Sequence, residues 1–176
     1  KASGRSVGII TSDALTGATP SAFYAHVPKR NMAQEIAAYA VSSDFDLLIG
    51  NGNRKPFLPN DKKGSRTDGR NICAELSGKG YLETSSEQAL AAAPAPRKVF
   101  GFASFPQQDT ASLSRTAALA FERLNTNPAG FFLMVECSNP DWGGHGNNPD
   151  QTAGGVLMTD FVVRKALDFA MKQKDT

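Results

Sequence analysis

An uninterrupted apolar run late in the chain most constrains what the chain can fold into. Residues 131–136, Phe-Phe-Leu-Met-Val-Glu, place five apolar side chains in succession and end on an acidic one. An apolar run of this length is typical of a strand covered on both faces, as in the parallel sheet of an α/β protein. The run therefore predicts a buried parallel strand that ends at Glu136.

Three potential metal ligands leave the end of this predicted strand. Glu136 closes it, Asp141 follows five residues later and His145 four residues after that, in a stretch with three glycines that we expect to be a loop. Open parallel sheets place their sites beyond the carboxyl ends of the strands, and carboxylate oxygen and imidazole nitrogen both suit Zn²⁺. On spacing alone, a loop glutamate, a capping aspartate and a surface histidine remain the alternative. Because the chain has 2 histidines, it cannot complete a three-histidine site.

The rest of the chain alternates apolar runs with stretches of helical periodicity. Further short runs predict buried strands at residues 7–10, 47–49 and 99–102. The intervening patterns predict helices starting near Asn31, over 71–76, over 86–93, over 112–125 and from about 151 to 172. We expect Asn31, with Gln34 in a capping box, and Asp150 to cap two of them. Strands alternating with helices predict an α/β fold with a mostly parallel sheet flanked by helices.

The bulk composition excludes several classes of protein. At 176 residues, with 40% hydrophobic and 20% charged residues, the chain suits one globular domain. A net charge of +2 without a basic block gives no case for nucleic acid. No apolar run approaches the roughly 20 residues of a membrane helix. Cys73 and Cys137 predict two small buried residues, and a single bridge between them stays open.

Several polar features are interpreted as structural or as surface. The segment 54–70 is rich in charged residues, Gly and Pro, and predicts an exposed excursion in which Asp61 and Asp68 are solvated. The sequence Gly-Asn-Gly at 50–52 is interpreted as a turn, because no full phosphate-loop motif follows it. His26, between apolar neighbours, is interpreted as a satisfied structural residue.

A second stretch whose side chains could bind a metal ion or phosphate follows the first predicted strand. We expect it to be a loop from Thr11 to about Lys29. The hydroxyl of Thr19 can ligate a hard cation such as Mg²⁺. The guanidinium of Arg30 presents a fork that matches phosphate bidentately. The alternative is a polar loop that leads into a capped helix.

Two long strings make the chain similar to a known family. The string TGATPSAFYAHVPKRN and the string GFFLMVECSNPDWGGHGNN resemble metal- and phosphate-binding stretches of alkaline phosphatases. Between them, RTDGRNICAEL and KGYLETSSEQAL fall in the family's order, so the resemblance covers nearly the whole chain. It implies that residues 1–176 are the central part of a single alkaline phosphatase α/β domain.

The resemblance also implies a role for individual residues. Thr19 and Glu136 would be Mg²⁺ ligands, Asp141 and His145 would ligate one of two catalytic Zn²⁺ ions, and Arg30 would clamp the substrate phosphate. The parent would be a phosphomonoesterase that hydrolyses small phosphate monoesters through a phosphoserine. It would be periplasmic or otherwise extracytoplasmic, with a homodimer as a possible assembly.

The chain departs from the family pattern in three places. Gly17 stands where many relatives have a histidine or aspartate beside the Mg²⁺ site, and Trp142 stands where others have a histidine or lysine. The nucleophile motif would lie before Lys1 and further metal ligands would lie beyond Thr176, so we expect negligible catalysis from this chain alone. The competing interpretation is a non-catalytic metal- or phosphate-binding remnant of the fold. A sulfatase is a weaker rival, because the stretch with Thr19 and Arg30 favours a phosphatase.

Overall fold

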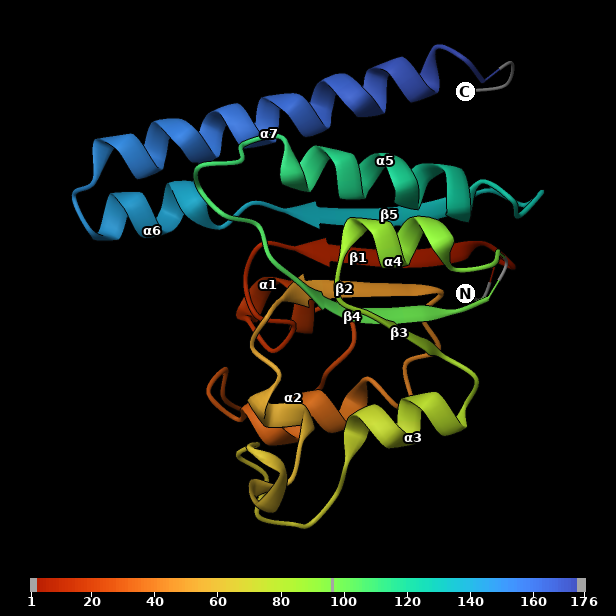
Figure 1. Ribbon diagram of the computed structural model, residues 1–176, viewed down its shortest axis with the longest axis vertical. Coiled ribbons are helices and arrows are strands. Elements are labelled where there is room, and N and C mark those ends of the chain that lie inside the picture. The colour runs from red at the N-terminus through yellow and green to blue at the C-terminus, as the bar shows by residue number, and fades with distance from the viewer. Residues whose placement is uncertain (1–2, 96, 174–176) are drawn as a thin grey trace.

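The fold is a parallel sheet with helices on both faces, as the sequence predicts. The computed structural model describes residues 3–95 and 97–173, so the expectations about the two ends of the chain lie outside the described residues. All strand pairs are parallel, in the order β3-β4-β2-β1-β5 (Figure 1). The strands are β1 (Ser6–Thr11), β2 (Leu47–Asn51), β3 (Leu82–Thr84), β4 (Val99–Ala103) and β5 (Phe131–Glu136).

The helices confirm most of the expected elements and add some that periodicity did not show. They are α1 (Ala18–Ser21), α2 (Ala33–Tyr39), α3 (Ile72–Gly78), α4 (Glu87–Ala92), α5 (Ser112–Leu124), α6 (Asn139–His145) and α7 (Pro149–Ala170), with 3-10 helices η1 (Lys55–Phe57) and η2 (Asn60–Lys62). Of these, α1, α6 and the 3-10 helices fall in stretches expected to be loops, and the short strand β3 was also missed. Each has at most seven residues, too few to establish a period.

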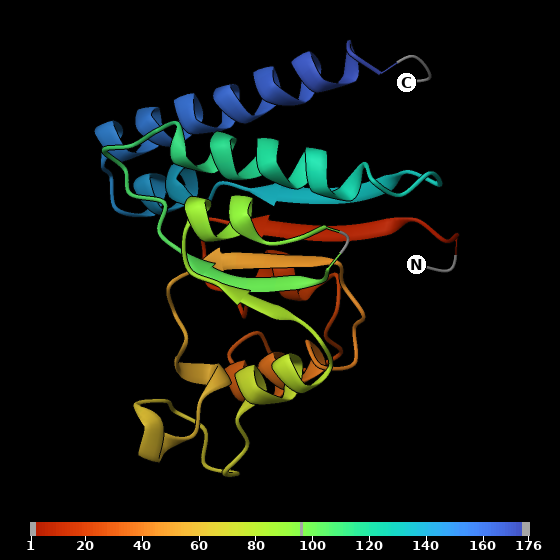
Figure 2. The same cartoon turned by 45° about the vertical axis from the view of Figure 1, so that its right-hand side comes forward.

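Alternation along the strands divides the core into two layers. Neighbouring side chains point to opposite faces of a sheet, so Ile9 and Ile10 enter different hydrophobic clusters. Ile9 packs with residues of α2 and α3, whereas Ile10 packs with residues of α5 and α7. Figure 2 shows α2 and α3 below the sheet, with α5 and then α7 above it. This arrangement leaves the carboxyl ends of β1, β2 and β5 open to the loops that follow them.

Two of the predicted helix caps are wrong. The helix near Asn31 begins at Ala33 with Met32 as N-cap, and the side-chain amide of Gln34 instead donates to the Ser65 carbonyl at 2.7 Å. The last helix is capped by Asn148, whose side chain accepts from the Gln151 amide, and not by Asp150. In both cases the predicted position misses the observed start of the helix by about one turn or less, which periodicity does not resolve.

Strand β5, the apolar run of residues 131–136, lies at the edge of the sheet. β5 pairs with β1, and on its other side no strand of the described part of the chain lies beside it. Phe132 is 48% exposed as a result, and the rest of the strand is only partly covered. The expectation of full burial is therefore wrong within the described residues, although the parallel direction and the end at Glu136 are confirmed.

The segment 54–70 is organised around a buried arginine instead of being wholly exposed. Arg66 is 2% exposed and donates from Nη1 to the carbonyls of Gln34 (2.5 Å) and Pro56 (3.1 Å). Its guanidinium also forms an ion pair with Asp68. Asp61 is exposed as expected, whereas Asp68 is a partner of this buried cation and not simply solvated.

The two cysteines are both free thiols, so the bridge that the sequence left open does not form in this structure. Cys73 is buried, as predicted, and burial raises the pKa of its thiol. Cys137 is only partly covered, just beyond the end of edge strand β5.

None of the helices in the described ranges is both long and apolar enough to cross a bilayer.

Candidate functional site

The carboxyl ends of β1 and β5 bring two polar side chains together. The parallel register places Thr11 opposite Glu136 at the last position of both strands. The buried hydroxyl of Thr11 donates to Glu136 Oε2 at 2.5 Å. A carboxylate held by a neighbouring strand in this way keeps its position without any ligand. The structure thus supports a fixed oxygen donor at Glu136.

A network of small polar groups surrounds this pair. The Ser12 amide donates to the Glu136 carbonyl (3.0 Å), the Ser138 amide donates to Ser12 Oγ (2.8 Å), and Asn51 Nδ2 donates to the Ser12 carbonyl (3.2 Å). The hydroxyl oxygen of Ser138 is buried without a hydrogen-bond partner. The sequence interpretation missed Thr11, Ser12, Asn51 and Ser138. Their shared signal is a polar residue at the carboxyl end of an apolar run.

Thr19 reaches this edge of the sheet on a single helical turn. It is the second residue of α1, which packs against β1 and β5, and it is exposed. Just beyond α1, the ring of Phe23 contacts Phe132 with centroids 5.9 Å apart, which ties the turn to β5. The structure therefore places the element that carries Thr19 beside the strand that carries Glu136.

Asp141 and His145 lie side by side because their segment is a helix and not the expected loop. They are four residues apart in α6, so they share one face of it. Asp141 Oδ1 and His145 Nε2 are 3.5 Å apart, and the two side chains are 72% and 82% exposed. Gly143, on the buried side, has no space for a Cβ, which would lie 2.6 Å from the Thr152 amide nitrogen at the start of α7. Close packing of Gly143 against α7 thus leaves Asp141 and His145 on the exposed side of α6.

Among the described residues, Arg30 makes no polar contact of its own with the four predicted metal ligands, Thr19, Glu136, Asp141 and His145. It is exposed in the turn before α2, and no hydrogen bond or ion pair links its guanidinium to them within the described part of the chain. His26 is exposed as well, and its ring stands edge-on to Tyr39 at 6.0 Å. The Tyr39 hydroxyl also donates to the His26 carbonyl at 3.1 Å, so these contacts are compatible with the structural role predicted for His26, at an exposed position.

The donors do not form a complete metal site on their own. Among the residues that the structure describes, no group of three or more His, Cys, Asp or Glu side chains lies close enough to hold a metal ion. Glu136 is held by Thr11, and Asp141 and His145 lie together on α6, but no hydrogen bond or ion pair within the described ranges joins Glu136 to that pair. Any ion bound here would need further donors, such as hydroxyls, water or residues beyond those described.

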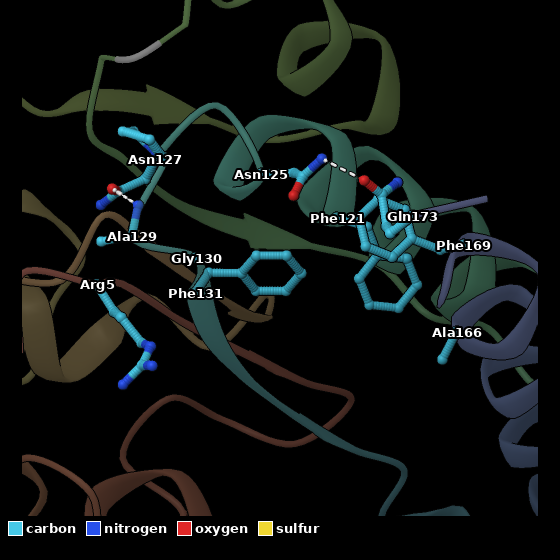
Figure 3. A pocket seen from close by; sticks show the side chains of 11 residues that line it. Arg5, Phe121, Asn125, Asn127, Ala129, Gly130, Phe131, Ala166, Phe169 and Gln173 are labelled. Carbon is cyan, nitrogen blue, oxygen red and sulfur yellow. Dashed lines mark hydrogen bonds between the residues drawn. The ribbon is translucent and has the colours of Figure 1, made fainter. Parts of the chain in front are cut away.

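A large cavity lies at the opposite end of the sheet. Figure 3 shows it between Arg5, the start of β5 and the ends of α5 and α7. Its volume is about 640 Å³. The rings of Phe121, Phe131 and Phe169 form its apolar side, and Asn125 donates to Gln173 at its rim. Parallel sheets place their sites at the carboxyl ends of the strands, so we assign the functional site to the edge with Glu136 and not to this cavity.

Known proteins share this fold and much of this sequence. Alkaline phosphatase 4 of Bacillus subtilis is 31% identical over 189 residues, which cover all of this chain and 39% of that protein. The alkaline phosphatase of Gadus morhua is 27% identical and again covers the whole chain. The chain thus spans about two fifths of the length of the curated relatives it matches.

Solved structures agree with this comparison. Alkaline phosphatase from the Antarctic bacterium TAB5 superimposes with a TM-score of 0.83 at 29% identity, covering 97% of this chain and 50% of that one. The Thermus thermophilus enzyme gives 0.86 at 27% identity, covering 99% and 38%. A variant of the TAB5 enzyme has been solved with Mg bound. The family model described as alkaline phosphatase matches residues 1–176. The chain therefore belongs to the alkaline phosphatase family.

Proposed function

We propose that this chain supplies part of the metal and phosphate site of a phosphomonoesterase that hydrolyses phosphate monoesters through a phosphoserine. Residues 1–176 would form the central part of a single catalytic domain, in a protein that acts outside the cytoplasm, for example in the periplasm, and assembles as a homodimer. The nucleophile and the remaining ligands would come from the part of the family's length that this chain does not span.

The observation that carries the proposal is the pairing of Thr11 and Glu136 at the ends of adjacent strands. It sets a carboxylate at the edge where α/β enzymes bind ligands, and α6 extends the same edge with Asp141 and His145 (Figure 1). Carboxylate and imidazole side chains at this edge of the sheet are the donors that a metal-dependent hydrolase uses.

The donor chemistry fits two kinds of metal ion. Glu136 and Thr19 offer hard oxygen donors, which suit Mg²⁺. Asp141 and His145 offer one oxygen and one nitrogen, which suit Zn²⁺, and their high exposure leaves them free to turn toward an ion. Metal ions in such sites activate the attacking oxygen and stabilise the leaving oxygen. The chain's own contribution is to hold these donors at one edge, with Glu136 fixed by Thr11.

Arg30 would contribute the phosphate clamp. Its exposed guanidinium can swing onto a phosphoryl group and donate two parallel hydrogen bonds. The helix α2 that follows is well anchored by Ile36 and Ala37, so the clamp would stand on a rigid base.

The test uses the full natural polypeptide that contains residues 1–176. We expect Arg30→Ala to weaken inhibition of aryl phosphate hydrolysis by inorganic phosphate by about 10- to 100-fold, as loss of a charge-assisted contact predicts. Arg30→Lys should recover only part of it, since lysine offers a point charge and no fork. The neighbouring exposed Lys29→Ala is the matched control and should change little.

Two outcomes would contradict the proposal. If the full polypeptide shows no metal-dependent hydrolysis of aryl phosphates, the chain is part of a non-catalytic remnant. If hydrolysis occurs but Arg30→Ala leaves phosphate inhibition unchanged, Arg30 has no part in the site.

A further inference from the structure

One acidic side chain at the functional edge has no role in the sequence interpretation. Asp13 follows β1 by two residues and is partly buried. Its amide donates to Thr11 Oγ1 at 2.9 Å, the same hydroxyl that donates to Glu136. Its carbonyl accepts from the Asn51 amide at 2.8 Å. The backbone of Asp13 is therefore built into the network that positions Glu136.

The carboxylate of Asp13 occupies the space above Gly17. Oδ1 accepts from the Ala14 amide at 2.7 Å. Oδ2 lies 2.5 Å from the point where a Cβ on Gly17 would be, closer than any such contact can be. Gly17 has φ −61° and ψ 161°, which every L-residue can adopt, so its backbone does not require glycine. The carboxylate, together with the Ala14 carbonyl oxygen 3.0 Å from the same point, explains the absence of a side chain at position 17.

This position lies at the base of α1. Gly17 is the N-cap of α1, and Thr19 is two residues beyond it. The carboxylate thus lies against the start of the element that carries Thr19, on a residue whose backbone belongs to the network that holds Glu136. Within the described part of the chain, neither Asp13 nor Glu136 forms an ion pair with a basic side chain. Partly buried carboxylates without a cationic partner favour the binding of a cation.

We propose that Asp13 is a positioning residue of the divalent cation site formed by Glu136 and Thr19, and that it takes the place a side chain at position 17 would fill. This inference rests on the proposed function, because it assumes a Mg²⁺-type ion at this edge. The carboxylate adds negative charge beside the site and accepts hydrogen bonds from the ion's hydration shell. The carboxylate of Asp13 thus compensates for the side chain that is missing at Gly17.

A structural interpretation predicts something different. As a turn residue alone, Asp13 would need only Oδ1, which accepts the Ala14 amide. Asn at this position keeps that oxygen, so Asp13→Asn separates the two roles: it preserves the turn and removes the charge. The exposed Asp61→Asn, in η2, is the matched control for loss of one negative charge.

The first experiment measures Mg²⁺ itself in the full natural polypeptide after chelation. We expect Asp13→Asn to weaken Mg²⁺ affinity in titration calorimetry by about 10- to 100-fold, the range found for residues that orient metal ligands. The thermal shift that saturating Mg²⁺ produces in the parent should shrink in parallel. Asp61→Asn should bind Mg²⁺ like the parent.

The second experiment moves the carboxylate. Gly17→Asp alone should lower thermal stability, because its Cβ meets Asp13 Oδ2 and a second negative charge arrives at the same place. Asp13→Ala with Gly17→Asp should remove this clash and restore Mg²⁺ affinity to within about threefold of the parent. Asp13→Ala alone should not.

The outcomes separate this inference from the proposed function. If Glu136→Gln abolishes Mg²⁺ binding while Asp13→Asn binds normally, Asp13 belongs to the turn and the inference is overturned. If neither variant changes Mg²⁺ binding, the proposed metal site itself is wrong, and the inference with it. A double variant that folds but fails to recover affinity would also overturn it.

Discussion

The segment 54–70 and the segment 137–148 look alike in sequence and differ sharply in structure. Both are polar, rich in glycine and free of a clear period. In the first, Arg66 is buried and its guanidinium donates to two carbonyls and a carboxylate. In the second, Asp141 and His145 are largely exposed and lie beside each other, and within the described ranges neither forms an ion pair with another residue.

The difference separates charges that hold the fold from charges available to a ligand. A buried guanidinium with several acceptors stabilises the fold, because removing it leaves those acceptors without a hydrogen-bond donor. Exposed donors on one helical turn contribute little to stability. We therefore expect variants in 54–70 to lose stability and variants in 137–148 to lose metal binding.

The largest expected effect is on stability, from Arg66→Met. Methionine keeps much of the side-chain volume, but the carbonyls of Gln34 and Pro56 lose their donor. We expect a loss of about 3 kcal/mol in the free energy of unfolding, measured by urea denaturation of the chain. Arg70→Met is the control: its ion pair with Glu75 is largely solvated and should matter by less than about 1 kcal/mol. Equal losses for both variants would erase the contrast between the segments.

The second effect is on metal binding, from His145→Ala. Trp142 is the only tryptophan and lies between Asp141 and His145, so its fluorescence reports ions bound to α6. We expect weak Zn²⁺ binding by the chain, because two protein ligands are fewer than the usual three. His145→Ala should weaken it at least about tenfold with unchanged stability.

The control for this experiment is the other histidine. His26→Ala removes an exposed imidazole from a different part of the fold and should leave the Zn²⁺ response of Trp142 intact. A response that follows His26, or one that survives both changes, would show that α6 is not the zinc-binding element.

The smallest effect is a pH dependence carried by Asp68. Hydrogen bonding from Arg66 is the main cause that lowers the pKa of this carboxyl below its ordinary value. A lowered pKa in the folded state stabilises the fold at neutral pH, and the stabilisation is lost as pH falls through the folded-state pKa. The melting temperature of Asp68→Asn should therefore fall less than that of the parent between pH 7 and pH about 3. Asp61→Asn should retain the parent's acid sensitivity.

Much of the site was predictable because its residues are local to strong patterns. The end of β5 at Glu136 follows from the apolar run before it. The four-residue separation of Asp141 and His145 can be taken from the sequence whatever the backbone conformation is. What spacing could not show is that these two share a face, since seven residues with three glycines do not reveal a helix. Packing of α6 against α7 supplies the stability that the local sequence lacks.

Apolar runs in the sequence were enough to predict β1, β2, β4 and β5, the parallel direction of the sheet and the kinds of donor that follow Glu136. The burial of Arg66 against the carbonyls of Gln34 and Pro56 and the hydrogen bond from Thr11 to Glu136 could be seen only in three dimensions. The physical reason is distance along the chain. Apolar periodicity is a property of neighbouring residues, whereas these contacts depend on strand register and loop packing, which bring residues such as Thr11 and Glu136 together only after the sheet has formed.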